Sequence, residues 1–427
     1  MFLVSASLTY CAWAQIKITG PGFTADPNGY RSDDSEAVRR RFIADTNSAV
    51  AARELEEERL RAKSEMKSSA IVTIAHVGPT SGAIAHLGKD NENGAIMAVE
   101  ELNAAGVTIG GKKVTIKLMT EDDGANPKQG TAVAQKLADA KVVGVIGHLN
   151  SGTSIPASKI YSDAGIPQIS PSATNPKYTR QGFKTTFRVM ADDTQLGSTL
   201  GKYAVNTLKG KAIAVIDDRT AYGQGVADEF SKAVVAAGGS IVAKEFTTDK
   251  ATDFNAILTT IKGKKPDVVF FGGMDAVAGP MLRQMKSLGI SAKFMGGDGI
   301  CSAELVKLGG DAIADNQVYC AEAGGVEKGS KFEAAKIDFE KRFKAKFGAD
   351  VQVYAPYVYD SVKLMVAAMV KAGSSDPEKY LPVLAATKDY QGVTGAIGFD
   401  NKGDIVNGAL TLQTVRGGKL EVLSVIR

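Results

Sequence analysis

The sequence lacks the features that mark several large functional classes. It contains no apolar run of the roughly 18 residues or more that a membrane-spanning helix requires, so none is predicted. Its net charge is only +4 over 427 residues, and it has no basic stripe interleaved with aromatic residues. Nucleic acid is therefore not an expected partner.

The motifs of common enzyme classes are also missing. Gly78–Gly82 (GPTSG) has no Lys-Ser/Thr pair, so it is not a phosphate-binding loop, and no GxGxxG suggests a dinucleotide fold. There is no GxSxG elbow, and Ser151 has no evident base beside it. The carboxylate pairs at residues 122–123 and 217–218 are interpreted as solvated turn acids rather than a glycosidase pair. We therefore expect no enzymatic activity and no cofactor.

Histidine and cysteine are scarce, with three residues of each. The histidines, His76, His86 and His148, lack the spacing of metal ligands, so no metal site is predicted. Cys301 and Cys320 both lie near predicted strand ends, where a bridge would close a short loop. In an exported protein this pattern favours a disulfide between them, and two buried thiols are the alternative.

The first 69 residues differ from the rest of the chain. Met1–Ala14 is apolar and ends in a small-x-small triplet that fits signal-peptide cleavage, although the basic n-region is missing. A short buried strand is the alternative. Residues 15–69 become highly charged, and opposite charges such as Glu57 and Arg61 favour a solvated helix. A partner-binding coiled coil is less favoured, because the apolar positions hold no heptad. We interpret residues 1–69 as a signal-like segment with a charged helical appendage.

From Ala70 onward, short apolar runs alternate with helical patterns in two series. The predicted strands cover residues 71–77, 113–120, 142–146, 166–169, 212–217, 240–246, 267–271 and 293–295. The predicted helices cover residues 93–105, 127–139, a segment starting at 151, 196–208, 222–237, 254–262, 280–288, 331–347 and 356–372. The tail, residues 395–425, is predicted to form antiparallel strands with a turn at 400–403. The alternation predicts two α/β lobes with parallel sheets.

Small hydroxyl residues follow two neighbouring strands of the first series. A helix is predicted to begin at Ser151, shortly after one strand, and Ser170–Thr174 follows the next. Ligands bind at the carboxyl edge of such sheets, and a helix start presents unpaired N–H groups and the positive end of its dipole. The segment therefore predicts a site for a small anion, with a carboxylate as the first candidate.

Six motifs occur in one order between Ala70 and Arg427: IAHVGPTSG, VIGHLNSGTSIPAS, PQISPSATNP, AIAVIDDRTAYGQG, DVVFFGGMDA and FMGGDG. Together they resemble the leucine/isoleucine/valine-binding proteins, the periplasmic solute receptors of branched-chain amino acid ABC importers. The resemblance implies a type I periplasmic-binding fold, with two Rossmann-like lobes joined by a three-crossing hinge and a ligand cleft between them. It assigns residues 70–191 plus 323–394 to one lobe, and residues 192–322 plus 395–427 to the other.

The resemblance also implies roles for individual residues. Ser151 would bind the ligand carboxylate, the Ser172 carbonyl would accept from the α-ammonium, and Thr174 would touch both groups. Tyr222 would close over the ligand, and Asp298 would pair with the ammonium. The other residues expected around the ligand are Leu87, Leu149, Ala173, Met274 and Tyr354.

Two of these positions depart from the family pattern. Reference members carry an aromatic residue where this chain has Leu87 and a tyrosine where it has Met274. Both positions line the side-chain pocket of those members, so the preferred amino acid stays open.

The expected function is that of a monomeric, non-enzymatic periplasmic receptor. It would close on a small aliphatic L-amino acid and present it to the membrane permease subunits of an ABC importer. The alternative is a cytoplasmic sensor of the same fold that binds an amino acid or amide and regulates a partner protein. A hydrolase or dehydrogenase is disfavoured by the missing motifs, since the fold alone excludes neither.

Overall fold

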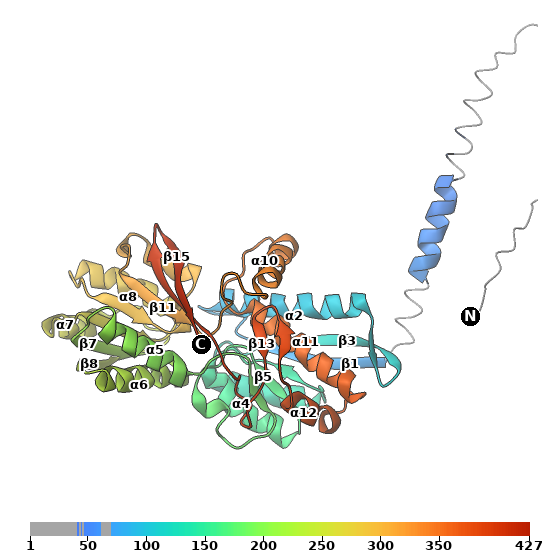
Figure 1. Cartoon of the computed structure of the whole chain (residues 1–427), viewed down its shortest axis with the longest axis horizontal. Coiled ribbons are helices and arrows are strands. Elements are labelled where there is room, and N and C mark those ends of the chain that lie inside the picture. Colours follow the sequence, from blue (N-terminus) through green and yellow to red (C-terminus); the bar gives the residue numbers. More distant parts are fainter. Residues whose placement is uncertain (1–40, 42–43, 45–46, 61–69) are drawn as a thin grey trace, which may run out of the picture. The chain divides into compact units, whose positions relative to one another are not determined.

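The computed structural model describes residues 41, 44, 47–60 and 70–427 (Figure 1). The chain divides into two compact units, Met1–Ser68 and Ser69–Arg427. In the first unit, residues 47–60 are helical and exposed, and Arg53 pairs with Glu57 at 3.7 Å. The predicted signal-like segment and Arg61 lie outside the described residues.

The first sheet of the second unit has the strand order β2-β3-β1-β4-β5-β6. All its neighbouring strands pair in parallel except β2 and β3. Ile74, Ile146 and Ile169, on three adjacent strands, are completely buried, as expected for a parallel sheet that is covered on both faces. The strands are β1 (Ala70–Gly78), β2 (Val107–Ile109), β3 (Lys112–Asp122), β4 (Val145–Ile146), β5 (Gln168–Ser170) and β6 (Thr186–Arg188). The helices of this segment are α2 (Ala85–Ala105), α3 (Pro127–Asp139) and α4 (Ser151–Asp163), followed by η1 (Pro176–Tyr178).

The second sheet has the strand order β15-β14-β11-β10-β9-β7-β8, and its last two strands in sequence, β14 and β15, are antiparallel additions. Its strands are β7 (Ala212–Asp217), β8 (Ser240–Phe246), β9 (Val268–Gly272), β10 (Lys293–Gly296), β11 (Val318–Glu322), β14 (Leu410–Arg416) and β15 (Lys419–Ile426). The helices of this part are α5 (Asp193–Asn206), α6 (Ala221–Ala236), α7 (Asn255–Gly263), α8 (Asp275–Ser287), η2 (Asp298–Ile300), α9 (Ala303–Gly309) and η3 (Gly310–Ala312).

The chain passes between the two sheets three times. It leaves the first sheet after β6, returns after β11, and enters the second sheet again at β14. The returning segment contributes α11, which packs against α2. It comprises α10 (Glu333–Phe347), α11 (Ala355–Ala372), α12 (Pro377–Ala385), and a hairpin of β12 (Tyr390–Gly392) and β13 (Gly395–Ile397). The α/β class and the three-crossing connection predicted from the sequence are confirmed. None of the described helices is both long and apolar enough to cross a membrane.

The helix predicted over residues 93–105 in fact begins at Ala85. Its first half contains Gly88 and Gly94, which lower helix propensity and hid the true start. Both glycines are needed for close packing. A Cβ on Gly88 would lie 2.0 Å from the Pro79 carbonyl oxygen, and one on Gly94 would lie 2.5 Å from the Ala355 carbonyl oxygen.

Further boundaries also differ from the prediction, among them the start of α5, which lies at Asp193 rather than at residue 196. The strand predicted over residues 142–146 is regular only over β4, and α8 begins at Asp275 rather than at Pro280, which lies inside it. The hairpin of β14 and β15 turns at Gly417 and Gly418. The turn predicted at residues 400–403 joins only an isolated antiparallel bridge between residues 399 and 405. Gly417 and Gly418 have φ values of 55° and 69°, a region that glycine enters without penalty.

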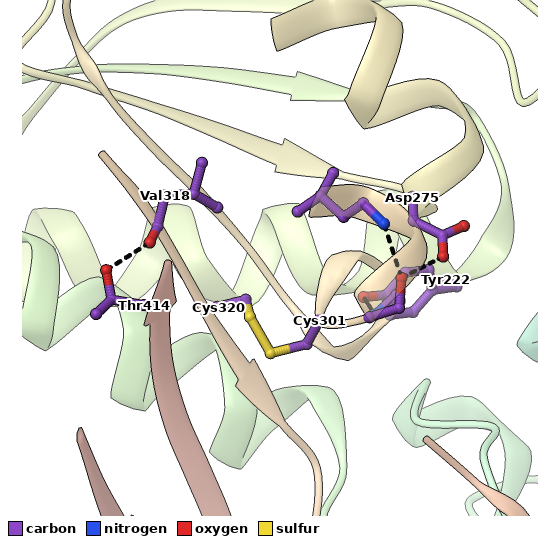
Figure 2. The surroundings of a disulfide bond; sticks show 9 residues. Tyr222, Asp275, Cys301, Val318, Cys320 and Thr414 are labelled. Carbon is purple, nitrogen blue, oxygen red and sulfur yellow. Dashed lines mark hydrogen bonds between the residues drawn. A yellow bond between two sulfur atoms is a disulfide. The ribbon is translucent and has the colours of Figure 1, made fainter. Parts of the chain in front are cut away.

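The disulfide between Cys301 and Cys320 is present (Figure 2), and its Cα atoms are 5.5 Å apart, within the usual range. It joins the residue that follows η2 to the middle of β11, and both cysteines are buried. The expectation of a bridge rather than two thiols is therefore confirmed.

We expect the bridge to protect both cysteines and to stabilise the fold. Thiol labelling of the unfolded, unreduced protein should leave Cys301 and Cys320 unmodified, and labelling after reduction should modify both. The double variant Cys301→Ala/Cys320→Ala should lose about 3 kcal/mol of unfolding free energy, because the cross-link restricts the unfolded chain. Two reactive thiols at these positions before reduction would contradict the assignment.

Removal of residues 1–68 should leave the second unit folded, because that unit contains both sheets and its own core. The truncated and full-length chains should show the same thermal midpoint by circular dichroism to within a few degrees. A clearly lower midpoint for the truncated chain would mean that the first unit contributes to the core.

Candidate functional site

The start of α4 forms the first part of the site. Ser151 is the first residue of this helix and is almost completely buried. Within the described chain, the N-cap Asn150 makes no side-chain hydrogen bond to the first turn, and the Thr153 N–H donates to its carbonyl. The N–H groups of Ser151 and Gly152 therefore remain available to an external acceptor. The Ser151 hydroxyl oxygen accepts a hydrogen bond from the Asn175 N–H at 3.1 Å. Its own proton can therefore be donated to a second acceptor.

The loop after β5 lies beside this helix start. Ser172 donates from its hydroxyl to the Leu149 carbonyl at 2.9 Å, and the Ala173 N–H donates to the Ser170 hydroxyl at 2.9 Å. Thr174 is completely buried, and its hydroxyl has no hydrogen-bond partner among the described residues. A buried hydroxyl in this position is expected to serve a ligand.

Arg188 fixes that loop from β6. Its guanidinium is completely buried, donates to the carbonyls of Ala173 at 2.8 Å and Asn175 at 3.0 Å, and pairs with Asp404 at 2.7 Å. These charge-assisted bonds hold the backbone around Thr174 in one geometry. The sequence analysis did not identify Arg188; a single arginine in the short apolar strand TFR was the available signal.

Tyr222 and Asp298 come from the second sheet. Tyr222 lies in the first turn of α6, and Asp298 begins η2 directly after β10. The Tyr222 hydroxyl accepts a hydrogen bond from the Gly299 N–H at 3.0 Å. A Cβ on Gly297 would lie 2.6 Å from that hydroxyl, so the glycines of FMGGDG leave room for the tyrosine ring.

Asp298 is buried, and only one of its two carboxylate oxygens accepts a hydrogen bond within the described part of the chain. One of its carboxylate oxygens accepts a hydrogen bond from the Tyr354 hydroxyl at 2.9 Å, and Oδ1 has no partner in the described part of the chain. Burial raises the pKa of Asp298 to about 6, and the hydroxyls of Tyr354 and Tyr222 act in the opposite direction. Tyr354 precedes α11, and its backbone is held by Asp90, which accepts hydrogen bonds from four consecutive N–H groups, those of residues 352–355.

Asp193, the first residue of α5, is a second buried acid that the sequence analysis missed. Neither of its carboxylate oxygens has a hydrogen-bond partner of normal geometry among the described residues. Burial raises its pKa well above the ordinary value; the nearby Thr174 hydroxyl opposes this effect, and the charge of Asp298 adds to it. The available signal was the pair of acids after β6: Asp192 caps α5, which leaves Asp193 without a structural role. We call Thr174, Asp193 and Asp298 the acid cluster.

The apolar candidates gather in the same core. Leu87 on α2, Leu149 before α4, and Met274 before α8 are all buried. They belong to one packed cluster that also contains Tyr222 and Tyr354. The sequence-predicted apolar candidates are therefore all buried in the main core, which contains residues from both sheets.

The arrangement combines three chemical environments. The acid cluster offers hydrogen-bond acceptors to a cationic group, the start of α4 offers donors to an anionic group, and buried apolar side chains belong to the same core as Tyr222 and Tyr354. Within the described residues, no group of three or more His, Cys, Asp or Glu side chains could hold a metal ion.

Comparisons with known proteins point to the same class. The chain matches the family model described as periplasmic binding protein over residues 71–419. A Leu/Ile/Val-binding protein homologue of Brucella abortus is 39% identical over 326 residues, which are 76% of this chain and 85% of the relative. A leucine-, isoleucine-, valine-, threonine- and alanine-binding protein of Pseudomonas aeruginosa is 36% identical over 336 residues, covering 79% of this chain and 87% of the relative.

A solved structure is similar over the same region. The branched-chain amino acid transporter substrate-binding protein of Streptococcus pneumoniae, in complex with isoleucine, has a TM-score of 0.74 and 30% identity. The match covers 83% of this chain and 99% of that one. These findings give the chain a type I periplasmic-binding fold and a solute-binding role. The resemblance seen in the sequence is confirmed: the chain belongs to the periplasmic binding protein family, among the leucine/isoleucine/valine-binding proteins.

Proposed function

We propose that this chain is the solute-binding receptor of an ABC importer and binds a small aliphatic L-amino acid. The observation that carries the proposal is the acid cluster, whose unpartnered oxygen atoms are buried near the start of α4. An isolated buried carboxylate is costly, and an α-ammonium supplies both the countercharge and three N–H donors. The names of the relatives, one an amino-acid-binding protein and one the substrate-binding protein of a branched-chain amino acid transporter, favour this role over a cytoplasmic sensor.

The ammonium of the ligand would lie among Asp298, Asp193, Thr174 and the Ser172 carbonyl. Its carboxylate would accept from the Ser151 hydroxyl and from N–H groups of the first turn of α4. Tyr222 would cover the ligand from the second sheet. The apolar side chain of the ligand would contact the other residues expected around it, which are Leu87, Leu149, Ala173, Met274 and Tyr354.

Ligand binding would be coupled to closure of the two lobes, residues 70–191 plus 323–394 and residues 192–322 plus 395–427. A ligand stabilises the closed state only through contacts that the open state lacks, and here Tyr222 and Asp298 would supply them. The closed monomer, in the periplasm, would then present the amino acid to the permease subunits of the importer.

Calorimetric titration with the twenty L-amino acids tests the proposal. Leucine, isoleucine or valine should bind to a single site, and 4-methylpentanoate, which is leucine without its ammonium group, should bind far more weakly. Failure of every amino acid to bind, or equal binding of leucine and 4-methylpentanoate, would refute the proposed role.

Loss of either acid should weaken binding strongly. A hydrogen bond to a charged group contributes about 1.5–3 kcal/mol, so Asp298→Asn and Asp193→Asn should each reduce leucine affinity about 10- to 100-fold. Asp311→Asn is a matched control, because the Asp311 side chain is 94% exposed and should leave affinity unchanged. Parent-like binding by both test variants would show that the acids do not meet the ammonium.

Met274→Tyr should change selectivity more than overall affinity, because position 274 would contact the side chain and not the charged groups. The order of affinities among leucine, isoleucine, valine and alanine should change in calorimetric titrations. Ser151→Ala is the comparison variant, and it should weaken all four ligands by a similar factor. If Met274→Tyr also weakens all four equally, Met274 has no part in selectivity.

A further inference from the structure

An ion pair between His86 and Asp275 joins a helix associated with the first sheet to a helix of the second. His86 lies on α2, which is associated with the first sheet, and Asp275 is the first residue of α8, which follows β9 of the second sheet. The His86 Nε2 atom is 2.7 Å from Asp275 Oδ2. The Ser302 hydroxyl donates to the same carboxylate oxygen at 2.5 Å and fixes its position.

The two members of the pair differ in burial. The Asp275 side chain is completely buried, whereas 21% of the His86 side chain is exposed. The histidine can therefore exchange protons with solvent while it contacts a carboxylate that is shielded from it.

The pair lies next to the side-chain end of the proposed ligand site. His86 immediately precedes Leu87, and Asp275 immediately follows Met274. Leu87 and Met274 are the two positions to which side-chain selectivity is assigned above. An ion pair between their neighbours therefore fastens the two sheets together beside the ligand.

Three acidic groups have the largest effect on the charge of His86, and Lys89 lies three residues further along the same helix. Burial lowers its pKa, but Asp275 on α8, Glu304 on α9 and Asp90 on α2 act in the opposite direction and outweigh burial. The pKa of His86 is therefore raised above its ordinary value when the pair is formed.

We propose that His86 and Asp275 form a latch that closes with the two lobes and makes amino acid affinity increase when His86 is protonated. This inference rests on the proposed function, because it concerns how the same site is held shut. In an open state the two residues would separate, and His86 would return to an ordinary environment.

The direction of the pH dependence follows from linkage. Because the closed state would bind the His86 proton more tightly than the open state, closure takes up a proton near neutral pH. The contribution of the latch to affinity is complete below the open-state pKa and is lost as the pH rises through the closed-state pKa. Asp298 acts in the opposite direction below about pH 6, since its protonation removes the countercharge of the ligand ammonium.

Comparison of the parent with His86→Gln isolates the latch, because Asp298 is present in both proteins. Leucine would be titrated calorimetrically at pH 6, 7 and 8.5. The parent should bind about fivefold more tightly than His86→Gln at pH 6, and less than twofold more tightly at pH 8.5, in the range expected for a partly exposed ion pair. Lys286→Gln removes an exposed charge from the end of α8 opposite Asp275 and should match the parent at every pH.

Proton exchange on binding gives a second test, made by comparing the same two proteins. Asp193 and Asp298, whose pKa values are raised, should release protons when they meet the ligand ammonium, and they do so equally in the parent and in His86→Gln. Leucine binding at pH 7.5, measured in buffers of different ionisation enthalpy, should therefore take up a fraction of a proton more in the parent than in His86→Gln. Equal proton exchange by the two proteins would overturn the latch, as would a parent-to-His86→Gln affinity ratio that is the same at all three pH values. If the parent binds no amino acid, the proposed function itself fails, which is a different result from binding with equal proton exchange.

Discussion

Asp193 and Asp298 are both buried, and neither forms an ion pair with a side chain in the described part of the protein. Burial of an uncompensated carboxylate costs several kcal/mol, so each group must either hold a proton or meet a cation. Burial raises the pKa of both groups, as expected for carboxyl groups that have no countercharge beside them. A ligand with an ammonium group would remove the imbalance, and this would make its binding energy large for a small molecule.

The surrounding structure keeps the two acids and Thr174 in place. Arg188 holds the loop that carries Thr174, and Asp90 holds the backbone around Tyr354, which in turn donates to Asp298. The disulfide ties the residue that follows η2 to β11, so the turn that begins at Asp298 is fixed covalently as well (Figure 2). Such preorganisation means that little order has to be created when a ligand binds.

The predictions that succeeded depend on local signals. The helix start at Ser151, the strand Ala212–Asp217 and the helix Pro127–Asp139 each have a cap or an apolar pattern within a few residues. The Cys301–Cys320 bridge was predicted because both cysteines lie near predicted strand ends and would close a short loop. The family was indicated by six motifs that occur in one order along the chain.

The residues that were missed depend on contacts between distant segments. Arg188 meets Asp404, 216 residues away, and His86 meets Asp275, 189 residues away. Asp193 stands next to a capping aspartate and resembles an ordinary helix start until its burial is known. The glycines that hid the start of α2 are explained only by the backbone against which they pack. Information of this kind lies in the three-dimensional structure and not in any window of sequence.

The most direct test of the account is a crystal structure of the protein with bound leucine. The account predicts that the ammonium nitrogen lies within hydrogen-bonding distance of Asp298 and Asp193, with the carboxylate at the start of α4. A leucine bound in the reverse orientation, or bound away from both acids, would contradict it.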